Sequence, residues 1–352
     1  MNISKENIIV EHDELIISKY VNNNSFIVNN SAHIIKPILY ILKLVYFLFK
    51  LLLLKKIMKQ AILIVAYKDL DYLGSIVDYF AGDDYLFFIH LNSLSKFSEE
   101  DLVALRDRKN VQLVMQKYAT RWGSLNHLKA ILYLCSEAIK YEVSYVHLIS
   151  GQDFPIKTGR EIQEVLKNNR DKEFIEYFPL PAKVWADENG GFDRIEYYHF
   201  YDFISSSSRF GRLILKTTFI AQKFLGIKRK INPALASKLY GGGTWWTLSK
   251  NCLAFVLNEI ESNKDFLDIL AYSKIPEEIL FQTIIMNSPY REKVVNENLR
   301  YIEWEWKNGS RPAILDESDF DKLRASNAFF ARKFIFPTSL KLAKALSELR
   351  LD

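Results

Sequence analysis

The stretch Ala61-Ile62-Leu63-Ile64-Val65-Ala66 is apolar at every position, and it decides the fold class. A short run of this kind is typical of a strand buried in a parallel sheet. Residues 70–80 follow with apolar side chains at helical spacing. Further strands are expected at 85–91, 111–115, 145–149 and 173–178. Residues 98–101 are expected to cap a further helix, and more helices are expected at 124–139, 158–168, 249–262, 276–286 and 338–349. This alternation predicts a doubly wound, mostly parallel sheet flanked by helices, with ligands beyond the carboxyl ends of the strands.

The composition is that of a globular protein. The chain has 352 residues, of which 49% are hydrophobic and 25% charged, too apolar for a disordered chain. The net charge of +5 is concentrated at the two ends. Residues 1–57 and 331–352 each carry +3, so 58–330 sums to −1, which argues against a general nucleic-acid binder. Cys135 and Cys252 lie in apolar periodic runs and are interpreted as core residues.

The N-terminal segment, 1–57, is expected to be a polar arm followed by an apolar helix, and 58–352 the main domain. Residues 37–54 are apolar except for Lys43 and Lys50, and Lys36 shares their seven-residue spacing. That spacing puts the three lysines on one stripe of a helix, which favours a helix lying in a membrane interface. A true membrane span and a helix packed on its own domain remain alternatives. Met58-Lys59-Gln60 also resembles a natural protein start.

Familiar phosphate-binding and nucleophile motifs are absent from the sequence. There is no Gly-rich dinucleotide fingerprint or P-loop, and no serine nucleophile elbow. Two Asp-x-Asp strings, 69–71 and 319–321, have the form that binds a divalent metal in many nucleotide-sugar transferases. Each lies at an expected helix start, where capping is the alternative role. No metal site is expected, so a bound diphosphate would need fixed cations.

Five segments carry polar or aromatic groups at places where a site is expected. Two are loops next to helix or strand ends, 121–124 and 150–155, and a third, 242–248, combines glycines with two tryptophans. The fourth, Pro276-Glu277-Glu278, opens a helix, since proline suits a first helical turn. The last, 329–334, places Arg332 and Lys333 between aromatic residues. Residues 181–235, rich in aromatic and charged side chains, are expected to be a long excursion lining the site.

In this order the segments resemble glycosyltransferase family 14, which includes core-2/I-branching β-1,6-N-acetylglucosaminyltransferases and protein O-xylosyltransferases. The resemblance runs from about Ala61 to Phe334. Its matching elements are the opening strand, Phe88-Ile89-His90-Leu91-Asn92, Trp122-Gly123-Ser124, Ser150-Gly151-Gln152-Asp153-Phe154-Pro155, Gly242-Gly243-Thr244-Trp245-Trp246, Pro276-Glu277-Glu278 and Phe330-Ala331-Arg332-Lys333-Phe334. The resemblance implies a GT-A-like fold, an inverting reaction and no metal requirement, with a UDP-sugar as co-substrate and no other cofactor.

The resemblance also assigns roles to single residues. Glu278 takes the place of the catalytic base, and Lys333 and Arg311 take the places of the cations that hold the diphosphate, with Arg332 as a further candidate. A carboxylate must accept the proton of the acceptor hydroxyl, and a helix N-terminus favours its ionised form. Candidates for the acceptor sugar are Glu176, Trp245, Trp246, Arg194 and Trp185, with core packing as the alternative for both Trp245 and Trp246.

The sequence departs from the family pattern at three positions and lacks one family feature. Tyr67 replaces a histidine, Asn92 an aspartate and Glu277 the aspartate of Pro-Asp-Glu. The paired cysteines of secreted animal members are missing, which favours a bacterial-type cytoplasmic enzyme, peripheral to or anchored in the membrane. The expected donor is UDP-GlcNAc or UDP-xylose, and the expected acceptor is a glycan or a lipid-linked saccharide. The alternative function is a non-catalytic, membrane-peripheral glycan-binding protein on the same fold.

Overall fold

The computed structural model describes residues 59–82 and 84–349. It divides the chain into two units, Met1–Ile57 and Met58–Asp352, and everything below concerns the second unit. The expected N-terminal apolar helix therefore lies outside the described residues, as does the interpretation of Met58 as a start. No helix within 59–82 and 84–349 is long and apolar enough to cross a bilayer.

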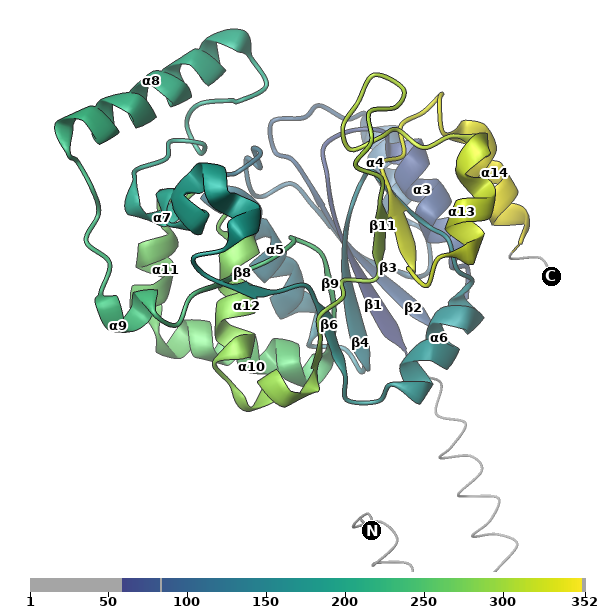
Figure 1. The fold of residues 1–352 in the computed structure, drawn as a ribbon. Coiled ribbons are helices and arrows are strands. Elements are labelled where there is room, and N and C mark those ends of the chain that lie inside the picture. The colour runs from purple at the N-terminus through teal and green to yellow at the C-terminus, as the bar shows by residue number, and fades with distance from the viewer. Residues whose placement is uncertain (1–58, 83, 350–352) are drawn as a thin grey trace, which may run out of the picture. The chain divides into compact units, whose positions relative to one another are not determined.

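The centre of the fold is a mixed sheet of seven strands in the order β10-β6-β9-β4-β1-β2-β3 (Figure 1). Strands β1 to β4 are mutually parallel, and β9 is antiparallel to both of its neighbours. The predicted fold class, a mostly parallel sheet flanked by helices, is thus confirmed. The bounds are β1 Gln60–Ala66, β2 Tyr85–Leu91, β3 Val111–Met115, β4 Tyr145–Ser150, β6 Glu173–Ile175, β9 Trp246–Ser249 and β10 Val294–Val295.

Helices cover both faces of this sheet (Figure 1). One apolar core lies between the sheet and α3, α4, α6, α13 and α14, and the other lies between the sheet and α5, α10, α11 and α12. Cys135 and Cys252 are free thiols buried in the second core, as predicted. The bounds are α3 Leu70–Tyr79, α4 Glu99–Arg106, α5 Leu125–Ala138, α6 Gly159–Asn168, α10 Lys250–Ser262, α11 Lys264–Leu270, α12 Glu277–Met286, α13 Phe320–Ala325 and α14 Leu340–Glu348.

Local sequence signals set the starts of several helices. Ser98, Ser124 and Ser249 each accept a hydrogen bond from a backbone N–H in the first turn of the helix that follows. Thr158 and Glu161 form a complete capping box at α6. These caps satisfy N–H groups that have no partner within the helix, which fixes where each helix begins.

Two smaller sheets were not predicted. Strands β11 Arg300–Ile302, β12 Phe330–Arg332 and β5 Asp153–Pro155 form one, and β7 Phe178–Pro179 and β8 Tyr240–Gly241 form the other. The expected strand 173–178 is wrong in its middle, because the chain leaves the main sheet after Ile175 and rejoins a different one at Phe178. This break frees Glu176 from the sheet.

The excursion 181–235 contains regular structure that the sequence did not predict. It includes the turn-like segment η2 Lys183–Gly191, two short helices, α7 Asp193–Glu196 and α9 Pro233–Ala236, and the long helix α8 Arg209–Leu225. Helix α8 was not predicted, and its most regular apolar stripe faces outward and not toward the core. In Figure 1 it lies at the edge of the described part of the chain.

Candidate functional site

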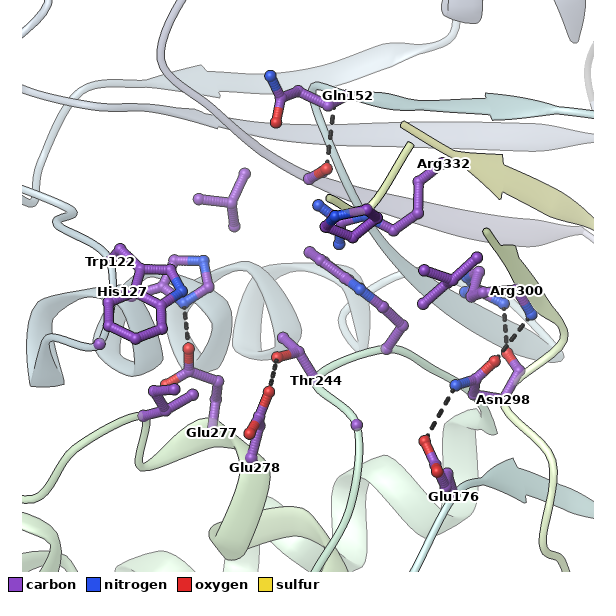
Figure 2. A pocket seen from close by; sticks show the side chains of 18 of the residues that line it. Trp122, His127, Gln152, Glu176, Thr244, Glu277, Glu278, Asn298, Arg300 and Arg332 are labelled. Atoms are coloured by element: carbon purple, nitrogen blue, oxygen red, sulfur yellow. Dashed lines mark hydrogen bonds and ion pairs between the residues drawn. The ribbon is translucent and has the colours of Figure 1, made fainter. Parts of the chain in front are cut away.

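A cavity of about 820 Å³ lies at the carboxyl ends of β1 and β4. Parallel sheets bind ligands at the point where strand order reverses, and here the order runs outward from β1 to β2 on one side and to β4 on the other. Tyr67 follows β1 and Gln152 follows β4, and both line the cavity. Figure 2 shows the side chains that converge there from α5, α12, β11 and β12.

Glu278, the predicted base, lies on the first turn of α12 and lines this cavity. Its Oε2 accepts a hydrogen bond of 2.6 Å from Arg194 Nη1, and its Oε1 accepts one of 3.1 Å from Thr244 Oγ1. Burial raises the pKa of Glu278 above its usual value, although the positive charge of Arg194 acts in the opposite direction. Burial is the largest of these effects, and it opposes the preference of a helix N-terminus for the ionised form.

Arg194 is held rigidly against Glu278. Its guanidinium carbon lies 3.6 Å from the centre of the Trp185 ring, and its Nε donates to Glu188 Oε2. Lys274 also donates to Glu188, so this carboxylate balances two cations. Arg194 is only 7% exposed, and Trp185 lies behind it and not at the cavity surface. This arrangement makes Arg194 a positioning residue for Glu278 and Trp185 its support.

Glu277 points to a different partner from its neighbour. Its Oε1 lies 2.7 Å from His127 Nδ1 on α5, and its Oε2 has no hydrogen-bond partner among the described residues (Figure 2). The residue two positions earlier, Ile275, has a φ of 51°. A β-branched residue rarely adopts this left-handed conformation, and strain of this kind clusters at functional sites.

Of the three predicted diphosphate cations, Arg332 lines the cavity, and Arg311 and Lys333 are not part of its lining. The segments that hold Arg311 and Lys333 are joined by a backbone hydrogen bond from Lys333 N to Ala313 O. Lys333 Nζ lies 3.4 Å from Ser310 Oγ, and Arg311 is exposed. Burial lowers the pKa of Lys333, with further contributions from Arg332 and from Lys68. Several cations close enough to repel one another form a place suited to a multivalent anion.

The other acceptor candidates separate into two groups. Glu176 and Trp245 line the cavity, where Asn298 Nδ2 donates to Glu176 Oε2 at 3.4 Å and Arg332 lies 4.6 Å from the Trp245 ring centre. Trp246 is fully buried and packs on Phe281 at 5.1 Å between ring centres. The interpretation of Trp246 as a sugar platform is therefore wrong, and its role is core packing. Its neighbour Trp245 precedes β9 and lines the cavity.

Sequence reasoning missed one buried charge of the site, Arg300. It lines the cavity at 7% exposure and donates to the carbonyls of Leu148 and Trp246 at 3.0 and 2.9 Å. Burial lowers the pKa of its guanidinium to about 9, while Asp153 acts in the opposite direction. Its Nη1 also donates to Thr247 Oγ1, which continues through His147 to Gln60 as a buried polar chain. An isolated arginine in a sequence gives no signal of such a role.

Two of the unusual positions in the sequence have different roles. Tyr67 is half exposed, and its hydroxyl accepts from Gln152 Nε2 at 3.2 Å across the mouth of the cavity. Asn92 lies outside the cavity and bonds both backbone groups of Thr120, which does line it. Asn92 therefore stabilises the loop around Thr120 and does not face the cavity.

The described residues contain no group of three or more His, Cys, Asp or Glu side chains arranged to hold a metal ion. Of the two Asp-x-Asp strings, Asp69 is the N-cap residue of α3 without a side-chain cap bond. Asp319 completes a capping box with Asp316 and accepts from Lys307 Nζ at 2.6 Å. Asp319 therefore has the helix-capping role that was the alternative to metal binding.

Comparison with known proteins gives the family. A family model described as Branch: Core-2/I-Branching enzyme matches residues 61–324. The chain belongs to the Core-2/I-branching enzyme family. This confirms the resemblance to glycosyltransferase family 14 that the sequence motifs indicated. Glu176, Trp245 and Glu278, which line the cavity, fall within the matched range, whereas Arg332 and Lys333 fall just beyond it.

Curated relatives within this family are distant. Xylosyltransferase 2 of Rattus norvegicus is 24% identical over 272 residues, 72% of this chain and 29% of the relative. Xylosyltransferase oxt of Drosophila pseudoobscura pseudoobscura is 22% identical over 273 residues, 71% of this chain and 28% of the relative. The chain spans less than a third of the length of these relatives. Among solved structures, apo mouse Xyloside xylosyltransferase 1 has a TM-score of 0.33 at 11% identity, covering 77% of this chain and 97% of that chain.

Proposed function

We propose that the chain is an inverting, metal-independent glycosyltransferase that moves a sugar from a UDP-sugar to a glycan or lipid-linked saccharide hydroxyl. The observation that carries the proposal is Glu278: a buried carboxylate at the strand-end cavity, hydrogen-bonded to Arg194 and Thr244. UDP-xylose and UDP-GlcNAc are the donors to test first. Family membership supports both, and the relatives named xylosyltransferases favour the first.

Glu278 acts on the acceptor hydroxyl. The carboxylate accepts the hydroxyl proton as the acceptor oxygen forms its bond to the anomeric carbon of the donor. The bond between that carbon and the diphosphate oxygen breaks, and UDP departs with the electron pair. A single displacement of this kind inverts the anomeric centre. A base whose pKa lies nearer the working pH accepts a proton more effectively, so the raised pKa of Glu278 suits the role.

The cations at the other edge of the cavity act on the leaving group. Negative charge grows on the diphosphate as its bond to the sugar breaks, and positioned cations stabilise that charge. Arg332, Lys333 and Arg311 supply it in this proposal, which is why no metal ion is invoked. In this proposal the acceptor sugar contacts Glu176 and Trp245, which line the same cavity as Glu278.

The test compares two neighbouring variants, Glu278→Gln and Glu277→Gln, with UDP-sugar turnover measured in the presence of EDTA. We expect Glu278→Gln to bind UDP normally and to lose turnover by about a thousandfold or more, because the base is gone. Glu277→Gln removes the same charge from the same helical turn but keeps an oxygen for His127, so it should lose about tenfold at most.

Three outcomes would contradict parts of the proposal. Turnover abolished by EDTA would rule out the metal-independent mechanism. Equal losses in the two variants would remove Glu278 as the base. Failure of the wild-type chain to bind UDP, with glycan binding intact, would favour the non-catalytic glycan-binding function instead.

A further inference from the structure

Helix α8, Arg209–Leu225, carries an apolar stripe on its outward side and a basic stripe along the flank next to it. Phe210, Leu213, Thr217, Ile220 and Phe224 recur at spacings of three and four residues, so they share one face of the helix. Phe210 is 72% exposed and Phe224 is 88% exposed, and Leu213 and Ile220 are each more than half exposed. Large apolar side chains in a contiguous exposed row mark an interaction surface.

The second stripe is basic and lies beside the first. Arg209, Arg212 and Lys216 follow one another at spacings of three and four residues, and Lys223, seven residues further on, is ion-paired with Asp193. The helix contains no acidic residue, and neither does any other position between Asp202 and Glu259. Those 56 intervening positions include nine Lys or Arg, seven of them within 209–230. The near-neutral charge of 58–330 therefore conceals a strongly cationic surface at α8.

The inward side of α8 fixes which stripe faces out. Gln222 exchanges two hydrogen bonds with the backbone of Tyr198, at 2.8 and 2.9 Å. Phe219 packs on Tyr197 and His199, and Lys223 Nζ donates to Asp193 at 2.6 Å. Since one side of the helix is anchored in this way, the apolar stripe cannot turn inward without breaking these contacts.

We propose that α8 binds the surface of a membrane that contains anionic lipids, with its apolar stripe in the acyl-chain boundary and its basic stripe against the headgroup phosphates. A helix that combines an apolar face with Lys and Arg on its polar side binds in this way. The charge complementarity selects this occupant, because a second copy of the chain would bring the same cations against one another. The contact lies on α8 and is separate from residues 1–57.

This orientation leaves the candidate site open. Leu215 and Phe219 line a second cavity of about 530 Å³, together with Arg212 and Lys216 of the basic stripe, and Arg194 lines the same cavity. Arg194 is the residue that holds Glu278. A membrane bound to α8 would therefore lie beside the second cavity, whereas no residue of α8 lines the first cavity, which contains Glu278.

The test places an environment-sensitive fluorophore on α8 in the full chain. Cys135 and Cys252 are both buried, so a Thr217→Cys variant offers the label an exposed thiol in the middle of the apolar stripe. Glu164→Cys on α6 is the matched control, because its side chain is also exposed and α6 lies far from α8 in Figure 1. Emission is recorded with vesicles of phosphatidylcholine, with and without phosphatidylglycerol.

We expect the label at position 217 to shift to shorter wavelength with phosphatidylglycerol vesicles, and the label at position 164 to stay unchanged. In the Thr217→Cys background, Arg209→Gln and Lys216→Gln should each lower the partition coefficient roughly fivefold, the equivalent of about 1 kcal/mol per charge. Phe210→Ser with Phe224→Ser should lower it by about tenfold or more. These side chains are exposed, so melting curves should match the parent chain.

Three results would overturn the proposal. The first is no shift at position 217 with anionic vesicles. The second is an equal shift at both positions, which would mean that another part of the chain carries the membrane contact. The third is a label at 217 that reports an apolar environment before any lipid is added, because the stripe would then be covered by another segment of this chain or by a second copy.

Discussion

At the scale of single residues, the proton affinity of Glu278 is set by two opposing influences. Its burial at the cavity floor favours the neutral carboxyl, and the guanidinium of Arg194 at 2.6 Å favours the carboxylate. Arg194 is itself held by Glu188 and by the face of Trp185. The sequence brings these residues from positions 185, 188, 194 and 278, so their mutual effect depends on the folded excursion.

An Arg194→Gln variant should move the acidic limb of the pH profile of kcat/KM to higher pH. Removing the cation disfavours the carboxylate, so the pKa of Glu278 rises further and a higher pH is needed to ionise the base. An adjacent opposite charge is worth about one to three pKa units. Rates measured from about pH 5 to about pH 9 should therefore show a large deficit at low pH that shrinks as the pH rises.

Arg194→Lys is the control for this prediction. It keeps a positive charge near Glu278, so its acidic limb should lie between those of the parent and Arg194→Gln. A deficit that is the same at every pH would mean that Arg194 supports the shape of the site and does not set the ionisation of Glu278.

At the scale of elements, the sequence predicted those whose signal is local. Strand β2 has the bounds that its apolar run predicts. Ser124 and Thr158 cap the helices that they were expected to open. Strand β12 escaped because its residues, Phe330–Arg332, were interpreted as a cation cluster between aromatics. Its pairing with β11 and β5 joins segments far apart in the chain, and no short-range pattern records such pairing.

The residues of the candidate site also differ in whether a local sequence signal predicts them. Glu278 and the cations near 332 were predictable because they sit in short motifs next to a helix start or an aromatic cluster. His127 and Glu277 are 150 positions apart, and their contact follows from the packing of α5 beside α12. Trp245 and Trp246 are adjacent, and only the folded chain shows that Trp245 lines the cavity and Trp246 is buried in the core.

The hydrogen bonds between Glu173 at the start of β6 and Ser249 at the start of α10 should make the free energy of unfolding depend on pH. Glu173 opens β6 and is fully buried, and it accepts hydrogen bonds of 2.7 and 2.6 Å from Ser249 N and Oγ at the start of α10. Burial raises its pKa to about 7. The unfolded chain releases this proton at lower pH than the folded chain, so the free energy of unfolding should fall between about pH 4.5 and about pH 7.

The size of this fall is about 3 kcal/mol at most for a carboxyl with this shift. Glu173→Gln cannot ionise but keeps an oxygen for the Ser249 N–H, so its urea unfolding free energy should change less over the same pH range. Identical pH profiles for Glu173→Gln and the parent chain would show that Glu173 does not carry this dependence.

At the scale of the whole molecule, the net charge of a long segment does not describe the charge of each surface that it forms. The sum over 58–330 is −1, yet α8 presents a basic stripe without an acidic residue. The cations near the cavity form a second cluster, at Arg332 and Lys333. A net charge taken along the sequence therefore excluded a general nucleic-acid binder but gave no sign of the cationic face beside the site.

The two apolar cores lead to a prediction about the first 57 residues. Both faces of the main sheet are covered by helices from within 70–349, and the described core residues on each side are numerous. A chain that starts at Met58 should therefore keep a Tm within about 2 °C of the full chain, since 1 kcal/mol shifts the Tm of a domain this large by about that much. Its affinity for UDP should also be unchanged, because every candidate site residue lies beyond Met58.

Differential scanning calorimetry and UDP titration on both chains measure this, with the label at position 217 showing whether α8 alone still binds anionic vesicles. A Tm lower by about 5 °C or more, or weaker UDP binding, would mean that 1–57 complete the fold or the site.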